Sequence, residues 1–280
     1  MHTVKAALEE LMASIDRIDA QVIMAEVLGV NRAWIAANPM RILTESEDAK
    51  IEMLAVQRAM GRPVAYLLNR REFYGRELEV GPDVLIPRPE TETLVEAALP
   101  RLTPRASCLD LGTGSGAIAV TIACQRPEAQ VMATDVSAAA LEVAARNAVK
   151  HHCAERIVFA QGSWYEPVAG RRFDVIVSNP PYVASADPHL GRGDLRFEPR
   201  GALTDGSGDG LDSIRAIVAG APAHLVPGGW VLFEHGYDQA AAVRGILASG
   251  GFTELISLAD LAGIPRVAGG KMGTEPRRQP

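Results

Sequence analysis

A run of glycines between a predicted strand and a predicted helix constrains this chain more than any other feature. The apolar stretch 108–111 leads into the segment Asp110-Leu111-Gly112-Thr113-Gly114-Ser115-Gly116, and a helical pattern follows over 118–124. Glycine allows a sharp turn here and lets a ligand lie against the backbone with no Cβ in the way. Such a loop opens the first crossover of nucleotide-binding α/β folds. A tight turn that binds nothing is the competing interpretation.

Strand-like and helical stretches alternate through the rest of the chain. Further strands are predicted at 131–134, 157–159, 173–177 and 230–233, and a further helix at 138–150. Alternation of this kind requires crossover connections and predicts an α/β fold with a mostly parallel, doubly wound sheet. The segment 183–210 shows little periodicity and is longer than most structureless loops, so it is a candidate lid.

The first 70 residues have a different pattern. Apolar residues recur at spacings of three and four, and Thr44 with Glu47 has the spacing of a helix capping box, while Asp19 is a candidate cap for the second helix. We therefore expect a small helical bundle over 1–70. Residues 71–90 place short apolar stretches between glycines and prolines, which predicts a β-hairpin connector.

Composition excludes several classes of protein. The 280 residues carry a net charge of −6, which disfavours a protein that follows a nucleic-acid backbone. The three cysteines are widely spaced, which argues against a disulfide framework or a metal site and favours a cytoplasmic location. We expect no membrane span, because no apolar run approaches 18–20 residues, and no signal peptide.

A carboxylate follows the second predicted strand of the sheet. Asp135 closes that strand roughly twenty residues after the glycine loop, where a carboxylate can accept hydrogen bonds from both hydroxyls of a ribose. Asp135 could instead only help to cap the helix near Ser137. Loop and carboxylate together indicate an adenosine-containing ligand, and at this point a nicotinamide enzyme remains possible.

The chemistry is indicated by Ser178-Asn179-Pro180-Pro181-Tyr182, which follows the strand predicted at 173–177. The prolines fix the backbone and leave rigid carbonyl acceptors, and Asn179 adds a side-chain oxygen. Two acceptors can hold both hydrogens of one NH2 group, while Tyr182 offers a flat wall for a planar amide or base. This arrangement suits methyl transfer from a sulfonium donor, which needs collinear approach and no metal.

Together these motifs resemble the amino-directed S-adenosylmethionine-dependent methyltransferases, and further segments resemble the HemK/PrmC family. The resemblance implies a Rossmann-like class I methyltransferase fold that methylates the side-chain amide nitrogen of glutamine in the Gly-Gly-Gln motif of peptide chain release factors. It spans about residues 65–270 and is carried by Arg71-Glu72-Phe73, Leu85-Ile86-Pro87-Arg88-Pro89-Glu90-Thr91-Glu92, Asp187-Pro188-His189-Leu190, Arg196-Phe197-Glu198-Pro199, Asp209-Gly210-Leu211-Asp212 and Glu234-His235-Gly236.

The resemblance also implies roles for residues and segments. The sequence as a whole predicts a helical domain over 1–70, a hairpin linker over 71–90, a methyltransferase domain over 91–272 and a disordered tail over 273–280, and the resemblance implies that the first domain docks the protein substrate. Asn179 and the Pro180 carbonyl would grip the glutamine amide, bordered by Pro181, Tyr182 and Arg88. S-adenosylmethionine, which leaves as S-adenosylhomocysteine, would be held by Gly112, Thr113, Gly114, Ser115, Gly116, Asp135, Trp164 and Asn179.

Three of the residues have simpler interpretations or depart from the family. Trp164 could merely pack under the sheet edge, and Arg88 could be a surface ion-pair residue. The family usually has glycine where Asn69 stands. The expected partners are class-one release factors, with no direct nucleic-acid binding.

Rival functions remain at this point. An Asn-Pro-Pro-Tyr motif would grip the amino group of adenine or cytosine in DNA or RNA equally well, but base flipping usually requires basic surface and extra recognition elements. A nicotinamide-dependent oxidoreductase would need a proton donor that the later segments do not supply. A non-catalytic adenosine-binding module would have no use for the Asn179 cluster.

Overall fold

The computed structural model describes residues 2–274. Residues 275–280 of the tail expected over 273–280 lie outside the described residues. The chain divides into two compact units, residues 1–70 and 71–280.

The first unit is a helical bundle around a small apolar core. Thr44 and Glu47 form the predicted capping box at the start of α4. The second helix is capped by Asp16, so the expectation for Asp19 was wrong; Asp19 instead accepts a hydrogen bond from Arg58 at 2.6 Å. The helices are α1 (Val4–Leu11), α2 (Arg17–Leu28), α3 (Arg32–Ala37), α4 (Glu45–Ala59) and α5 (Val64–Leu67).

A short hairpin follows the bundle. Strands β1 (Arg70–Phe73) and β2 (Arg76–Glu79) pair in a two-stranded sheet. Asn69 has φ +54°, a conformation that favours glycine and that asparagine tolerates better than most residues, so asparagine can stand at a position where glycine is usual. The hairpin ends at Glu79. Residues 84–86, expected as part of it, form no strand and lie in an irregular segment.

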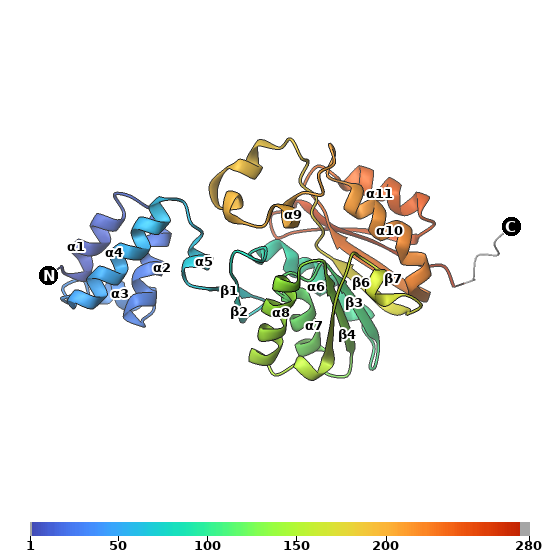
Figure 1. The fold of residues 1–280 in the computed structure, drawn as a ribbon, viewed down its shortest axis with the longest axis horizontal. Coiled ribbons are helices and arrows are strands. Elements are labelled where there is room, and N and C mark those ends of the chain that lie inside the picture. The colour runs from blue at the N-terminus through green and yellow to red at the C-terminus, as the bar shows by residue number, and fades with distance from the viewer. Residues whose placement is uncertain (1, 275–280) are drawn as a thin grey trace. The chain divides into compact units, whose positions relative to one another are not determined.

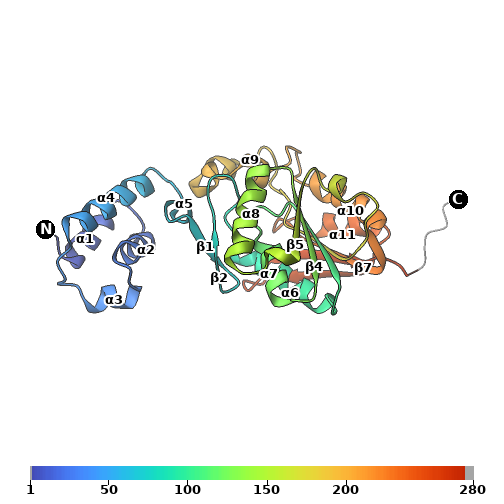
Figure 2. The same ribbon diagram turned by 60° about the horizontal axis from the view of Figure 1, so that its bottom comes forward.

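The second unit is built on a seven-stranded sheet with the order β5-β4-β3-β6-β7-β9-β8 (Figures 1 and 2). The five strands from β3 to β7 are parallel, whereas β9 is antiparallel to both β7 and β8. The sequence did not predict the last two strands. The strands are β3 (Ser107–Leu111), β4 (Gln130–Asp135), β5 (Ile157–Gln161), β6 (Phe173–Ser178), β7 (Leu225–Glu234), β8 (Thr253–Ala259) and β9 (Pro265–Lys271).

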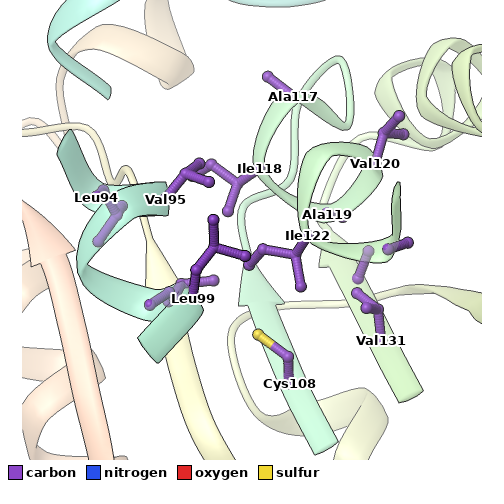
Figure 3. Packing of buried hydrophobic residues seen from close by; sticks show 14 of the residues in the cluster. Leu94, Val95, Leu99, Cys108, Ala117, Ile118, Ala119, Val120, Ile122 and Val131 are labelled. Carbon is purple, nitrogen blue, oxygen red and sulfur yellow. The ribbon is translucent and has the colours of Figure 1, made fainter. Parts of the chain in front are cut away.

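Helices cover both faces of this sheet, because successive strand side chains point to opposite sides. Cys108 packs in the cluster that contains α6 and α7, while Leu109 packs with α10 and α11. Figure 3 shows side chains of α6 and α7 meeting over Cys108 and Val131 of the sheet. The helices of this unit are α6 (Glu92–Ala98), α7 (Ala117–Gln125), α8 (Ala138–Lys150), α9 (Arg200–Leu203), α10 (Asp212–His224) and α11 (Ala240–Ser249).

The chain order reverses between two neighbouring strands. From β3 the chain moves outward through β4 to β5, then returns to β6 on the other side of β3. Ligands of open parallel sheets bind at such a switch point, outside the carboxyl ends of the strands. Leu111 of β3 pairs with Thr134 and Ser178, and Ser178 pairs with Phe233 of β7. The glycine loop, Asp135, Asn179 and Glu234 therefore leave the sheet at the same edge.

Candidate active site

A cavity of about 320 Å³ opens at this edge. Its walls come from the loops after β3, β4, β5 and β6, from residues 83–91 and from the start of α9. Of the residues singled out in the sequence, those lining it are Gly112, Thr113, Gly114, Ser115, Asp135, Trp164, Asn179 and Pro181. One cavity thus brings together the glycine loop and the Asn-Pro-Pro segment, which are more than 60 residues apart in the chain.

The glycine loop is held in a conformation that requires glycine. Gly112, Gly114 and Gly116 have φ of +71°, +56° and +81°. A Cβ at Gly116 would come within 3.0 Å of the Ala144 side chain, so this glycine also lets α7 and α8 approach each other. The side chain of Asn147 donates to the Ser115 carbonyl at 2.9 Å, which anchors the loop from α8.

A buried carboxylate lies beneath the loop. Asp110 is fully buried, and one of its oxygens accepts a hydrogen bond from the Thr113 hydroxyl at 2.7 Å. The other oxygen has no hydrogen-bond partner. Burial raises the pKa of Asp110 to about 7, because the charged form is poorly solvated there. A cation bound near the loop would therefore stabilise the charged form of Asp110.

Asp135 makes two backbone hydrogen bonds and still lines the cavity. One of its oxygens accepts from the Gly114 amide and the other from the Ser137 amide, both at 2.9 Å. Asp135 thus bonds the backbone next to the N-cap of α8, as the simpler interpretation expected. Each carboxylate oxygen has a second lone pair, so both can also accept a ribose hydroxyl.

Trp164 lies on the same side of the cavity. Its ring approaches to 4.0 Å the position that a Cβ would occupy at Gly112. The side chain also packs against the core cluster beneath α10 and α11. It therefore supports the sheet edge and lines the cavity, so the two interpretations offered by the sequence are compatible.

Asn179 is oriented by a chain of hydrogen bonds that reaches into the core. Its Nδ2 donates to the Thr91 hydroxyl oxygen at 3.1 Å, and that hydroxyl donates to the Glu234 carboxylate at 2.6 Å. The Tyr182 hydroxyl donates to the other oxygen of Glu234 at 2.8 Å. Burial raises the pKa of Glu234, while the two hydroxyl donors and nearby Arg266 oppose the rise. Burial and Glu234 also raise the pKa of Tyr182.

The remaining predicted residues border this arrangement without lining the cavity. Pro180 is buried, and Tyr182 turns its hydroxyl toward Glu234. Arg88 forms an ion pair with the buried Glu198, and the other oxygen of Glu198 accepts from the Ile86 amide at 2.9 Å. Gly116 faces α8 as described above. The surface ion-pair interpretation of Arg88 was thus partly right, but its partner is buried.

Sequence reasoning gave no role to Thr91, Glu234 or Glu198. All three lie in segments quoted for the family resemblance, and all three are buried. One signal was available: Glu234 directly follows the apolar run of β7, where an acidic residue at a strand end falls on the ligand edge of the sheet.

Within residues 2–274, no group of three or more His, Cys, Asp or Glu side chains is arranged to hold a metal ion. No helix in the same part of the chain combines the length and the apolar character needed to cross a membrane.

Comparison with known proteins agrees with this geometry. The family described as PrmC N-terminal domain matches residues 1–68, and the family described as Methyltransferase small domain matches residues 89–191. Proteins named release factor glutamine methyltransferase are 52% identical in Xylella fastidiosa, covering 92% of this chain and 94% of that one, and 52% identical in Burkholderia pseudomallei, covering 95% and 96%.

A solved structure supports the fold. A methyltransferase from Pyrococcus furiosus has a TM-score of 0.53 at 21% identity and covers 78% of this chain and 97% of that one. At that identity the likeness concerns the fold alone.

Proposed function

The chain belongs to the release factor glutamine methyltransferase family, and from this membership we propose the reaction that its site performs. The enzyme transfers a methyl group from S-adenosylmethionine to the side-chain amide nitrogen of the glutamine in the Gly-Gly-Gln motif of class-one release factors. The observation that carries the proposal is Asn179, whose Nδ2 is bound to Thr91 in the wall of the cavity that the glycine loop also lines. Methylation of nucleic-acid amino groups is not favoured, because the relatives reported above are named for release factors.

The residues present fit S-adenosylmethionine. The glycines leave the loop free of side chains, Asp135 has lone pairs for two ribose hydroxyls, and the Trp164 ring can cover the adenine. Asp110 lies buried under the loop with one oxygen unpartnered, and a bound cation would favour its charged form. When bound, the cofactor supplies an activated methyl group, so the protein needs neither a metal nor a strong acid for this step.

The protein's own task is then to hold the acceptor. The oxygen of Asn179 and the carbonyl of Pro180 accept the two N–H groups of the glutamine amide and keep its nitrogen facing the methyl donor. Positive charge develops on that nitrogen as the new N–C bond forms, and the same two acceptors stabilise it. One of the two protons then leaves the nitrogen for solvent, and the product is the neutral N-methyl amide.

The proposal extends to partners and location. Residues 1–70 dock the protein substrate, which agrees with the exposed apolar side chains Met53 and Val56 of α4 and Met60 at its C-cap, at spacings of three and four. Release factors act with cytoplasmic ribosomes, so we place the reaction in the cytoplasm. The net charge of −6 disfavours direct binding to a nucleic-acid backbone.

Labelled methyl transfer tests the function. The purified enzyme should label a release factor, and replacement of the glutamine in its Gly-Gly-Gln motif by alanine should abolish labelling. Transfer to nucleic acid and not to the factor would contradict the proposal. A thermal shift with NAD and none with S-adenosylhomocysteine would contradict the cofactor assignment. Asn179→Ala should lower turnover roughly 100-fold, as the loss of one preorganised polar group often does, while leaving S-adenosylhomocysteine affinity nearly unchanged.

A further inference from the structure

The Asn179 side chain is hydrogen-bonded to a residue outside the Asn-Pro-Pro-Tyr motif. We propose that Thr91, held in place by the buried Glu234, is a positioning residue that fixes which end of the Asn179 amide faces the glutamine. The inference rests on the proposed function. It is carried by two hydrogen bonds, Asn179 Nδ2 to Thr91 Oγ1 at 3.1 Å and Thr91 Oγ1 to Glu234 at 2.6 Å.

The direction of these bonds follows from the groups themselves. The Thr91 hydroxyl has a single proton, which it donates to Glu234 Oε2. The Thr91 hydroxyl oxygen can therefore only accept a hydrogen bond from Asn179. The NH2 group of the Asn179 amide must face Thr91 to donate it. The second oxygen of Glu234 is already occupied by the Tyr182 hydroxyl, so the carboxylate is held from both sides.

The orientation of the Asn179 amide decides whether its oxygen can accept a hydrogen bond from the glutamine of the substrate. With Nδ2 turned to Thr91, the oxygen of the amide is left as the acceptor for the NH2 group of the substrate. If the Asn179 amide were flipped, its NH2 group would face the NH2 group of the substrate glutamine. The substrate N–H would then have no acceptor. Linked hydrogen bonds also polarise one another, so a carboxylate at the end of the chain makes the Asn179 oxygen a stronger acceptor.

Glu234 acts from outside the site. It is 1% exposed and is not among the residues that line the cavity, whereas Thr91 and Asn179 line it. The charged groups near Glu234 are Arg266 of β9 and Glu90 of the turn before α6. Because Glu234 does not reach the cavity, its influence on the substrate passes through Thr91 and Asn179.

Thr91→Val tests the proposal, because valine keeps the shape of threonine and removes the hydroxyl. We expect kcat to fall about 10-fold, the size of effect expected for one hydrogen bond, with the affinity for S-adenosylhomocysteine unchanged. Thr91→Ser retains the hydroxyl and should restore kcat to within about 2-fold of the wild type. An unchanged kcat in Thr91→Val, or an equal loss in Thr91→Ser, would overturn the proposal.

The matched control is Thr121→Val in α7. Thr121 is also fully buried and its hydroxyl also makes one hydrogen bond, to the Ala117 carbonyl at 2.7 Å. This variant loses a buried hydroxyl without touching Asn179, so kcat should stay at the wild-type value. An equal fall in kcat in Thr121→Val would mean that any buried hydroxyl has this effect, and positioning would be refuted.

A double-mutant cycle separates positioning from a general structural effect. If Thr91 acts through Asn179, Thr91→Val should cause no further loss of kcat in an Asn179→Ala background. A further 10-fold loss in that background would show that Thr91 acts independently and would contradict the proposal.

Binding provides a readout that needs no turnover. With S-adenosylhomocysteine present, Thr91→Val should bind a release factor about 10-fold more weakly than wild type, and Thr91→Ser should bind it normally. Unchanged binding in Thr91→Val together with unchanged kcat would refute the role. If the wild-type enzyme neither binds nor methylates any release factor, the proposed function fails, and that result is distinct from a failure of Thr91.

Discussion

Glu198 and Ile86 are joined by a hydrogen bond across 112 positions of sequence, from the Ile86 amide to a carboxylate oxygen at 2.9 Å. The other oxygen of Glu198 pairs with Arg88. Both partner residues lie in the irregular segment after the hairpin, and Glu198 precedes α9. Since both segments line the cavity, this carboxylate joins two of its walls.

Glu198→Ala should therefore destabilise the enzyme and loosen the cavity. The change leaves the Ile86 amide and the Arg88 guanidinium without their acceptor, which should cost about 2 kcal/mol of unfolding free energy. It should also raise the KM for the release factor. Urea denaturation and steady-state kinetics measure both effects. Glu9→Ala, which removes the exposed Lys5–Glu9 pair of α1, is the control and should change neither quantity.

Gly210→Ala should disrupt the Asn-Pro-Pro-Tyr segment. Gly210 has φ +68°, and an added Cβ would lie 2.2 Å from the Tyr182 carbonyl oxygen. The Tyr182 backbone must shift, so we expect a loss of about 2–4 kcal/mol in stability and a strong fall in turnover. Gly208→Ala is a matched control, since a Cβ there meets nothing within 4 Å. Equal behaviour of the two variants in thermal denaturation and methyl-transfer assays would contradict this account.

Asp135→Ala should weaken cofactor binding before it affects turnover. The change removes both proposed ribose acceptors and the acceptors of the Gly114 and Ser137 amides. We expect at least a 10-fold weaker affinity for S-adenosylhomocysteine by calorimetry, with kcat at saturating cofactor reduced much less. An unchanged affinity would mean that Asp135 only accepts hydrogen bonds from the Gly114 and Ser137 amides and does not contact the cofactor.

The parallel part of the sheet could be predicted from sequence because its inner strands β3, β4, β6 and β7 are largely buried and read as apolar runs, and the edge strand β5 also carries the apolar run 157–159 although only Ile157 of it is buried. The two antiparallel strands could not. In β9, Gly269 and Gly270 weaken the strand pattern, yet a Cβ at Gly269 would lie 2.5 Å from the Val231 carbonyl oxygen. Glycine at this position allows β9 to pack closely against β7. Such a contact exists only in the folded protein, so the sequence pattern does not reveal it. In β8 most residues are exposed or half-buried, so no clear apolar run marks it.

The residues of the candidate site also fall into those that the sequence could predict and those that it could not. Residues that follow strands, such as Asp135 and Asn179, could be placed because carboxyl ends of parallel strands meet at one edge. Thr91 and Glu234 could not, since their roles depend on a contact across 143 positions of sequence. The hairpin was predicted too long because the apolar residues at 84–86 are buried without forming a strand, except for the half-buried Leu85.

Asp110 should make the stability of the ligand-free enzyme fall as the pH rises. Its pKa is about 7 in the folded protein and near 4 in an unfolded chain, so the folded state binds the extra proton between these values. Stability from this group is fully present below pH 4 and is lost as the pH rises through 7. Asp110→Asn keeps an acceptor for the Thr113 hydroxyl and removes the buried charge. At pH 8 the variant should therefore be more stable than wild type by roughly 2–4 kcal/mol, and this gain should vanish near pH 4. Urea denaturation at the two pH values measures the difference, and a gain of equal size at both would show that charge burial is not its cause.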